Sequence, residues 1–127
     1  MSHRRRARGS AVVDFVLVML VLVPLVLGIL QVSLVLFVRN TLTAAASDGA
    51  RYGATVGHSP QDAAARARSQ ISGAVADRFA RDVDARVVSV GGAPTVVVTV
   101  HATVPALGLG GPAVDLTVDG HAVQEQP

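Results

Sequence analysis

The chain has 127 residues, of which half are hydrophobic, 3% are aromatic and none is cysteine. This length leaves room for one modest domain beside a membrane segment, and the lack of cysteine excludes disulfides, thiolate zinc sites and a cysteine nucleophile. All eleven basic residues are arginine, and no basic stripe with interleaved aromatic residues runs along the chain, so the pattern excludes the usual nucleic-acid-binding protein.

The formal net charge of +2 is unevenly distributed along the chain. From residue 10 onward, seven arginines stand against nine acids, which gives a side-chain charge of −2. The high isoelectric point therefore belongs to the first nine residues. Four arginines with no acid among them precede Gly9: Arg4, Arg5, Arg6 and Arg8.

Residues 15–38 form an uncharged, mostly apolar run of 24 residues. As a helix this run would be about 36 Å long, enough to cross a hydrocarbon core of about 30 Å with some tilt. Four arginines before the run against one directly after it, Arg39, predict a single-pass cell-membrane protein whose N-terminus is cytoplasmic and whose C-terminal part is extracytoplasmic. A signal peptide removed after Ala46 is a weaker alternative, because the apolar region of a signal has only ~7–15 residues.

One charge, Asp14, lies inside the N-terminal end of the apolar stretch. A carboxylate just inside a membrane helix is costly, and it usually marks a function with a partner. A cut after Gly9 would expose a new amine on Ser10 and make Asp14 the fifth residue of the product. This geometry would turn a membrane anchor into a chain that can be processed and assembled. A plain membrane anchor explains the arginines, but it does not explain the small residues Gly9 and Ser10 between the charges and the apolar run.

The rest of the chain predicts a small unit with one amphipathic helix and a sheet. Ser59, Pro60 and Asp62 have the residue types of a helix N-cap, first turn and N3 position. The apolar residues that follow at helical spacing extend to Phe79, and we expect this helix to pack on a sheet of the same chain rather than on the membrane interface. Before it, Asp48 and Arg51 have the spacing of a pair on one helix.

The sheet is predicted from alternating residues and turn signals. Strands are expected at residues 85–90, at 95–104 and after a Gly-rich loop at 107–112, whereas Asp82 and Asp84 are expected in a linker. We therefore predict an α+β fold with a long transmembrane helix, an amphipathic helix and a three-stranded antiparallel sheet. The expected organisation is a basic leader at 1–9, the transmembrane helix with its extension at 10–56, and an extracytoplasmic α+β domain at 57–127.

No pattern in the sequence indicates catalysis. The four histidines are scattered without the spacing of a metal site, and no Ser/His/Asp set has a supporting motif. We therefore predict a protein that is not an enzyme, that has no metal, cofactor or small-molecule substrate, and that acts through contacts with other proteins.

Residues 8–15 and 44–53 resemble the TadE-like family of pseudopilins, from tight-adherence (Flp-type) pilus systems of bacteria. The family pattern is a basic leader, a Gly followed by a small residue, an acid at the fifth position, a long apolar helix containing Pro, and an alanine-rich stretch ending in Gly-Ala-Arg-Tyr. Asp14 departs from this pattern, in which Glu is usual. The resemblance implies that a membrane-bound prepilin peptidase cuts between Gly9 and Ser10 on the cytoplasmic side, so that the chain is the substrate of that enzyme.

The resemblance also implies partners and a role. In a bundle of such helices, the Asp14 carboxylate could pair with the Ser10 amine of a neighbouring subunit. The partners are the lipid bilayer, other pilin-like subunits and the platform proteins of the pilus or secretion system, and the role is in surface adhesion or export. The alternative is a permanently anchored envelope scaffold or adaptor that crosses the membrane once and keeps its leader. A tethered envelope enzyme is a third and weaker alternative, because the sequence lacks a catalytic set.

Overall fold

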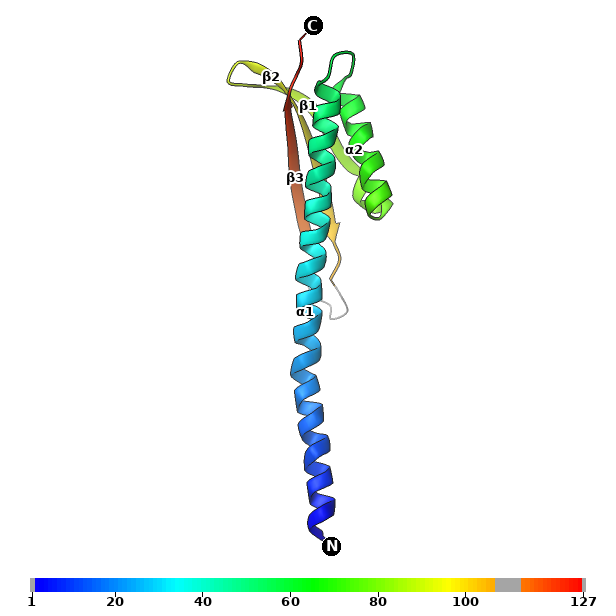
Figure 1. The fold of residues 1–127 in the computed structure, drawn as a ribbon, viewed down its shortest axis with the longest axis vertical. Coiled ribbons are helices and arrows are strands. Elements are labelled where there is room, and N and C mark those ends of the chain that lie inside the picture. The colour runs from blue at the N-terminus through cyan, green and yellow to red at the C-terminus, as the bar shows by residue number, and fades with distance from the viewer. Residues whose placement is uncertain (1, 107–112, 127) are drawn as a thin grey trace.

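A long helix and a small helix-and-sheet unit make up the computed structural model, which describes residues 2–106 and 113–126, with side chains from residue 7 onward (Figure 1). Three strands form one antiparallel sheet in which each strand pairs with the next along the chain, so the predicted α+β fold is confirmed. The Gly-rich loop predicted at 107–112 lies outside the described residues. In chain order the elements are α1 (Ser2–Ala54), α2 (Pro60–Ala74), the 3₁₀ turn η1 (Asp77–Ala80), β1 (Asp82–Val90), β2 (Ala93–Val104) and β3 (Val114–Val123).

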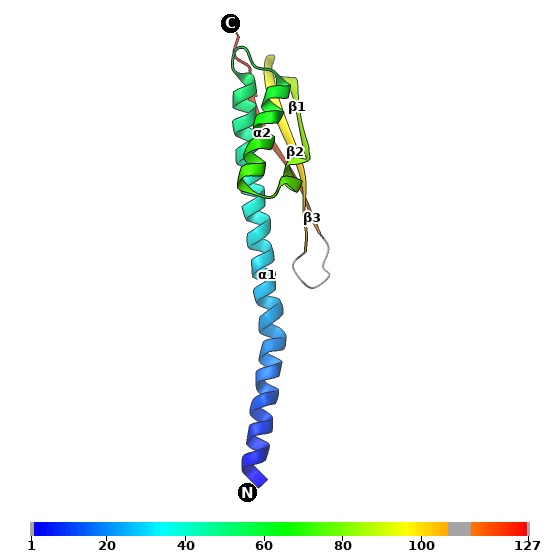
Figure 2. The same ribbon diagram turned by 90° about the vertical axis from the view of Figure 1, so that its right-hand side faces the viewer.

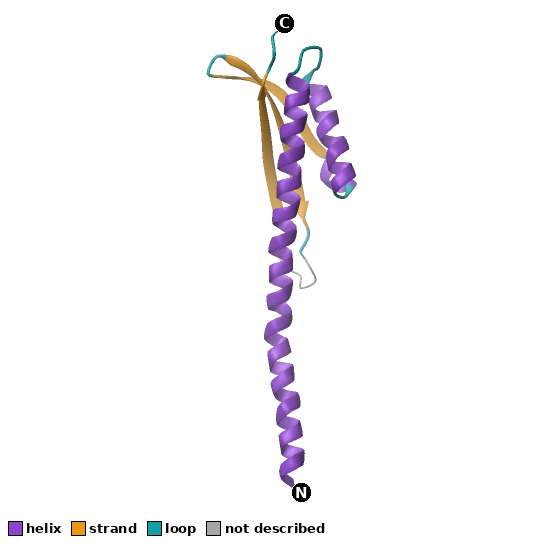
Figure 3. Ribbon diagram, in the orientation of Figure 1, coloured by secondary structure: helices purple, strands orange, loops and turns teal. Residues whose placement is uncertain are grey.

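Helix α1 is a continuous rod of 53 residues, about 80 Å long at 1.5 Å per residue. It continues through Pro24, although an interior proline removes one backbone hydrogen bond. Its N-terminal half projects away from the rest of the molecule (Figures 1 and 3). The large apolar side chains of this half are exposed. A helix that is apolar all round needs an apolar environment, and α1 is the one helix among the described residues long and apolar enough to cross a membrane.

The C-terminal half of α1 forms one wall of the folded unit. Buried side chains recur along it every four residues, at Val38, Leu42, Ala46, Ala50 and Ala54, and Ala45 is buried beside Ala46. This face packs against the inward side of β2, where Val96, Val98, Val100 and Val104 are also fully buried, as their alternation predicts. Burial of a residue the size of Leu42 contributes about 1.5–3 kcal/mol.

The outer end of the apolar run also packs on the folded unit. Val38 is 1% exposed, and Leu34 and Val35 are partly buried against the same core, so these residues face protein. The uncharged run at 15–38 contains both a free part and a part that the sheet covers. Hydropathy alone does not distinguish the free part from the covered part, because a helix carries apolar side chains both where it faces lipid and where it packs on a protein core.

Helix α2 lies directly on α1, with the sheet on one side of both helices (Figure 2). The sequence predicted the sheet as its packing surface, but α2 packs on α1 as well as on β1 and β2. Gly49 and Gly53 of α1 allow this approach. A Cβ atom on Gly49 would lie 2.7 Å from the Ala63 carbonyl oxygen, and one on Gly53 would collide with the Ala63 methyl group.

The start of α2 has the predicted capping arrangement. The Ser59 hydroxyl accepts a hydrogen bond of 3.2 Å from the Asp62 backbone N–H, and the Ser59 backbone N–H donates one of 2.8 Å to Asp62 Oδ2. The Ser59 backbone N–H, followed by the Ser59 hydroxyl, lowers the pKa of Asp62. Because the pKa is lowered on folding, the cap stabilises α2 at neutral pH and loses this contribution as the pH falls below about 4.

Two boundaries differ from the sequence prediction. Helix α2 ends at Ala74, and Phe79 lies in the separate turn η1. Phe79 is nevertheless buried in the same core as the apolar face of α2. Strand β1 begins earlier than predicted, because Asp82 and Asp84 pair with His101 and Thr99 of β2 rather than forming a linker. Their carboxylates are exposed on the outer face of the sheet and alternate with inward-facing neighbours, so a strand accommodates them.

Strand β3 approaches α1 closely at Gly120. A Cβ atom there would collide with the backbone of Ala46 and Ser47, so Gly120→Ala is expected to push α1 and β3 apart and to lower the free energy of unfolding by about 1–3 kcal/mol. The measurement is thermal unfolding of the full chain in detergent micelles, followed by circular dichroism. Gly73→Ala is the control, because a Cβ on Gly73 meets nothing within 4 Å and should stabilise α2. Equal stability of the Gly120 and Gly73 variants would contradict the close approach.

Candidate functional site

The predicted processing and assembly residues all lie at the free end of α1. Gly9, Ser10 and Asp14 are helical and exposed. Asp14 is four residues after Ser10, so the two lie on the same face of the helix, about 6 Å apart along its axis. The structure thus brings together the peptide bond and the carboxylate that the sequence singled out. It places them on a surface that no other element of the described chain covers.

Asp14 has apolar neighbours and no partner within the part of the chain described here. Val13 and Phe15 beside it are 56% and 61% exposed, and no ion pair or hydrogen bond of the Asp14 side chain occurs among the described side chains. A carboxylate in apolar surroundings is stabilised by an opposite charge or by hydrogen-bond donors. A partner for Asp14 in an assembly therefore has room to approach from another chain.

The basic leader lies at the tip of α1, at the end opposite the sheet (Figure 1). Arg8 is helical and exposed, whereas the side chains of Arg4, Arg5 and Arg6 lie outside the described residues. If the apolar part of α1 crosses a bilayer once, this arrangement places the leader and the folded unit on opposite sides of it.

A polar cluster holds α2 against α1 farther along the rod. Asp48 Oδ2 accepts hydrogen bonds from Arg66 Nε at 3.1 Å and from Gln70 Nε2 at 2.6 Å. The predicted pair of Asp48 with Arg51 on the same helix is therefore wrong. The carboxylate bonds across the interface instead, because α2 presents two donors to it at once.

Aromatic contacts extend this cluster toward the loop between the helices. The rings of Tyr52 and His58 stack with their centroids 4.2 Å apart, and the Arg66 guanidinium carbon lies 5.4 Å from the Tyr52 ring centroid. Sequence reasoning missed this role of Tyr52 and Arg66. The cluster links the two helices, and its half-exposed groups are engaged with one another.

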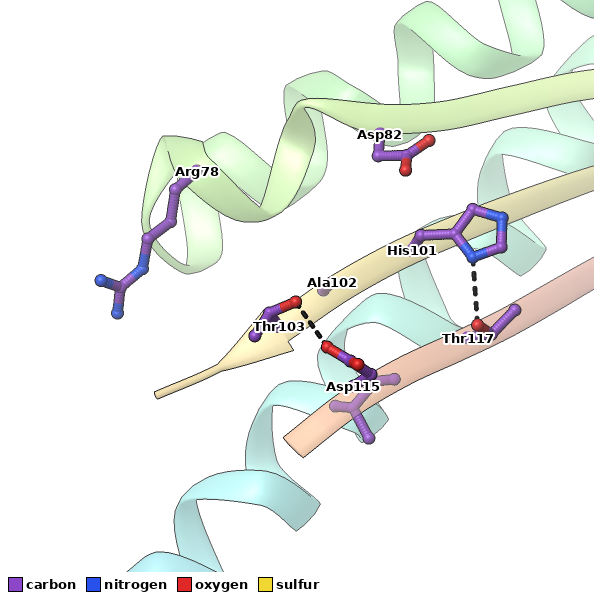
Figure 4. A pocket seen from close by; sticks show the side chains of 8 residues that line it. Arg78, Asp82, His101, Ala102, Thr103, Asp115 and Thr117 are labelled. Atoms are coloured by element: carbon purple, nitrogen blue, oxygen red, sulfur yellow. Dashed lines mark hydrogen bonds between the residues drawn. The ribbon is translucent and has the colours of Figure 1, made fainter. Parts of the chain in front are cut away.

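The outer face of the sheet carries an open pocket of about 680 Å³ (Figure 4). Its polar side chains bond across the strands: Thr103 Oγ1 donates to Asp115 Oδ1 at 2.7 Å, and His101 Nδ1 lies 3.0 Å from Thr117 Oγ1. No group of three or more His, Cys, Asp or Glu residues that would hold a metal ion occurs within residues 2–106 and 113–126. These pairs fit the solvent-facing side of a sheet.

The comparisons with known proteins bear on α1. Residues 9–51 match the family model described as TadE-like protein, which confirms the resemblance identified from the sequence. The match begins at Gly9 and ends within the alanine-rich part of α1 that packs on α2 and the sheet. No curated protein and no solved structure matches the chain.

Proposed function

We propose that this chain, which carries a TadE-like segment over residues 9–51, is a pilin-like membrane subunit of a tight-adherence (Flp-type) pilus system that is cut after Gly9. The family match supports a pilus-associated, pilin-like membrane protein, and the single long apolar helix fits a single-pass protein. The observation that carries the finer proposal is the placement of Asp14. It is exposed one helical turn after Ser10, at the end of α1 where the family match begins.

The structure gives a physical reason for a cut at Gly9. A peptidase must reach the carbonyl of the Gly9–Ser10 bond, and in α1 this bond is part of a helix. Glycine in a helix is less favourable than alanine by about 1 kcal/mol, so the helix opens most easily at such a residue. Removal of residues 1–9 also removes the four leader arginines, which otherwise hold that end of α1 at the cytoplasmic face.

Assembly then depends on the new N-terminus. The cut turns Ser10 into a free amine with a positive charge, and Asp14 carries the negative charge that α1 leaves unpaired among the described side chains. When processed helices pack side by side, the Asp14 carboxylate of one subunit pairs with the Ser10 amine of the next. Transferring either charge alone into lipid would be costly, and the attraction between the two charges offsets part of this free-energy cost.

The proposed role is structural. The folded unit contributes surfaces for other pilin-like subunits and platform proteins, and the chain is the substrate of a prepilin peptidase on the cytoplasmic side. The leader arginines set this orientation, with the folded unit extracytoplasmic. The polar pairs on the outer face of the sheet support this role, because the side chains that line its pocket bond to one another across the strands.

Intact mass spectrometry of the protein from native membranes tests the proposal. We expect a species that begins at Ser10, because the exposed Gly9–Ser10 junction precedes the apolar run directly. A species that retains the leader would instead support the permanently anchored scaffold and contradict the pilin-like subunit. The same preparation from cells that lack a prepilin peptidase is the control, and it should give only the longer species.

A further inference from the structure

The end of the sheet nearest the free half of α1 reaches down the side of this helix. Gln31 Nε2 donates a hydrogen bond of 3.3 Å to the Pro105 carbonyl oxygen, just beyond the last residue of β2. Both views show β2 ending and β3 beginning beside the middle of the rod, with the N-terminal half of α1 free below them (Figures 1 and 2). Gln31 therefore marks the level at which the free part of α1 gives way to the folded unit.

This contact limits how deep α1 can lie in a bilayer. If hydrocarbon extended to Val38, the Pro105 carbonyl beside Gln31 would lie about 10 Å below the surface, since seven residues of helix separate Gln31 from Val38. Irregular backbone and open strand ends do not face lipid in the hydrocarbon region, because nothing there satisfies their polar groups. The outer boundary of the hydrocarbon must therefore lie at about Gln31.

The inner boundary follows from the thickness of the bilayer. A hydrocarbon core of about 30 Å takes about 20 helical residues, and counting back from Leu30 reaches Ala11. In this register Asp14 lies about one turn inside the inner boundary, and the Gly9–Ser10 bond lies in the headgroup layer. Arg39 lies about 12 Å beyond the outer boundary, among headgroups and water.

We propose that the end of the sheet rests on the outer headgroup layer, with the lipid surface as its partner. Val114 at the start of β3 is exposed at this end, and so are Ala113 just before it and Pro105 just after β2. Arg78 belongs to the same pocket as Thr103 and Asp115, and its guanidinium points away from the strands (Figure 4).

The side chains at this level match a headgroup layer. On α1, Leu36 and Phe37 are 51% and 58% exposed just above Gln31, where the headgroup layer begins. Asp115, the carboxylate next to Val114, is hydrogen-bonded to Thr103. The folded unit is thus seated on the membrane rather than held away from it on a stalk.

Single-cysteine labelling tests this seating, because the natural chain has no cysteine. We would introduce Ala113→Cys at the proposed contact, Ser89→Cys in the exposed far part of β1, and Val21→Cys in the middle of the free helix. Each full-length variant is labelled with an environment-sensitive fluorophore and placed in vesicles of phosphatidylcholine and phosphatidylglycerol. Iodide quenches a label that is exposed to water, and nitroxide-labelled lipids quench a label that lies at headgroup depth.

The expected result is severalfold weaker iodide quenching at position 113 than at position 89, with nitroxide lipids quenching only the former. The difference should persist when the protein is diluted in excess lipid. Equal iodide access at the two positions would overturn the seating, and so would protection that disappears on dilution, because a second copy of the chain would then be the cover.

The Val21 label separates this proposal from the proposed function. The seating needs only the membrane span and not the cut after Gly9. If iodide quenched the label at position 21, this label would lie in water, and both the membrane span and the seating would be overturned. A buried label at 21 with an accessible one at 113 would overturn the seating alone. Circular dichroism of each variant verifies that the fold is kept.

Discussion

Replacing Gly9 with alanine is expected to leave the protein at its precursor mass, with residues 1–9 still attached. The side chain added at this position meets nothing within 4 Å, so the fold of the chain has no reason to change. Alanine also favours the helix by about 1 kcal/mol over glycine, which makes the scissile bond harder to open. The loss of processing would therefore arise at the peptidase, and intact mass from native membranes would measure it.

Gly28→Ala is the matched control for this variant. Gly28 lies on the same helix, and a Cβ on it also meets nothing within 4 Å, so the two substitutions make the same chemical change in the same structural setting. The Gly28 variant should be processed like the natural protein. Normal processing of the Gly9 variant would contradict the proposed cleavage site, whereas failure of both variants would indicate a general defect in membrane insertion.

Replacing Asp14 with alanine is expected to separate processing from assembly. The scissile bond lies one turn away and keeps its own residues, so the cut after Gly9 should proceed. Without the carboxylate, the Ser10 amine of a neighbouring subunit loses its charge partner in an apolar layer, and a buried charge without a partner is strongly destabilising. Chemical cross-linking of subunits in cells would measure the expected loss of assembly, alongside electron microscopy of pili.

Two further variants make this test specific. Asp14→Glu keeps the charge and lengthens the side chain by one methylene group, so it should retain assembly. Asp84→Ala removes an exposed carboxylate from β1 on the outer face of the sheet and should leave both processing and piliation unchanged. Normal piliation of the Asp14→Ala variant would defeat the charge pairing, and a block in its processing would assign Asp14 to peptidase recognition instead.

Features that depend on neighbouring residues could be predicted from the sequence. The start of α2 follows from Ser59 and Asp62, because a cap needs only one turn of helix to form its hydrogen bonds. The inward face of β2 follows from its alternating valines in the same way. The candidate site is local as well, because Gly9, Ser10 and Asp14 lie within six residues on one helix.

Features that depend on packing between distant segments could not be predicted. Asp48 bonds to Arg66, which is 18 residues away, and only the docking of α2 brings the two together. The roles of Gly49 and Gly120 likewise appear only when a second backbone approaches them. The outer limit of the free helix is of the same kind, because a sheet from the far part of the chain covers Val38.

The contact between Gly120 and Ala46 also has a consequence for biosynthesis. Gly120 of β3 is made more than seventy residues after Ala46, so the part of α1 that β3 covers lacks this strand while the intervening elements are synthesised. Contacts between segments so far apart in the chain form slowly, because a long loop must close first. The apolar side chains of α1 that β3 covers therefore stay without this cover until the end of the chain has been made.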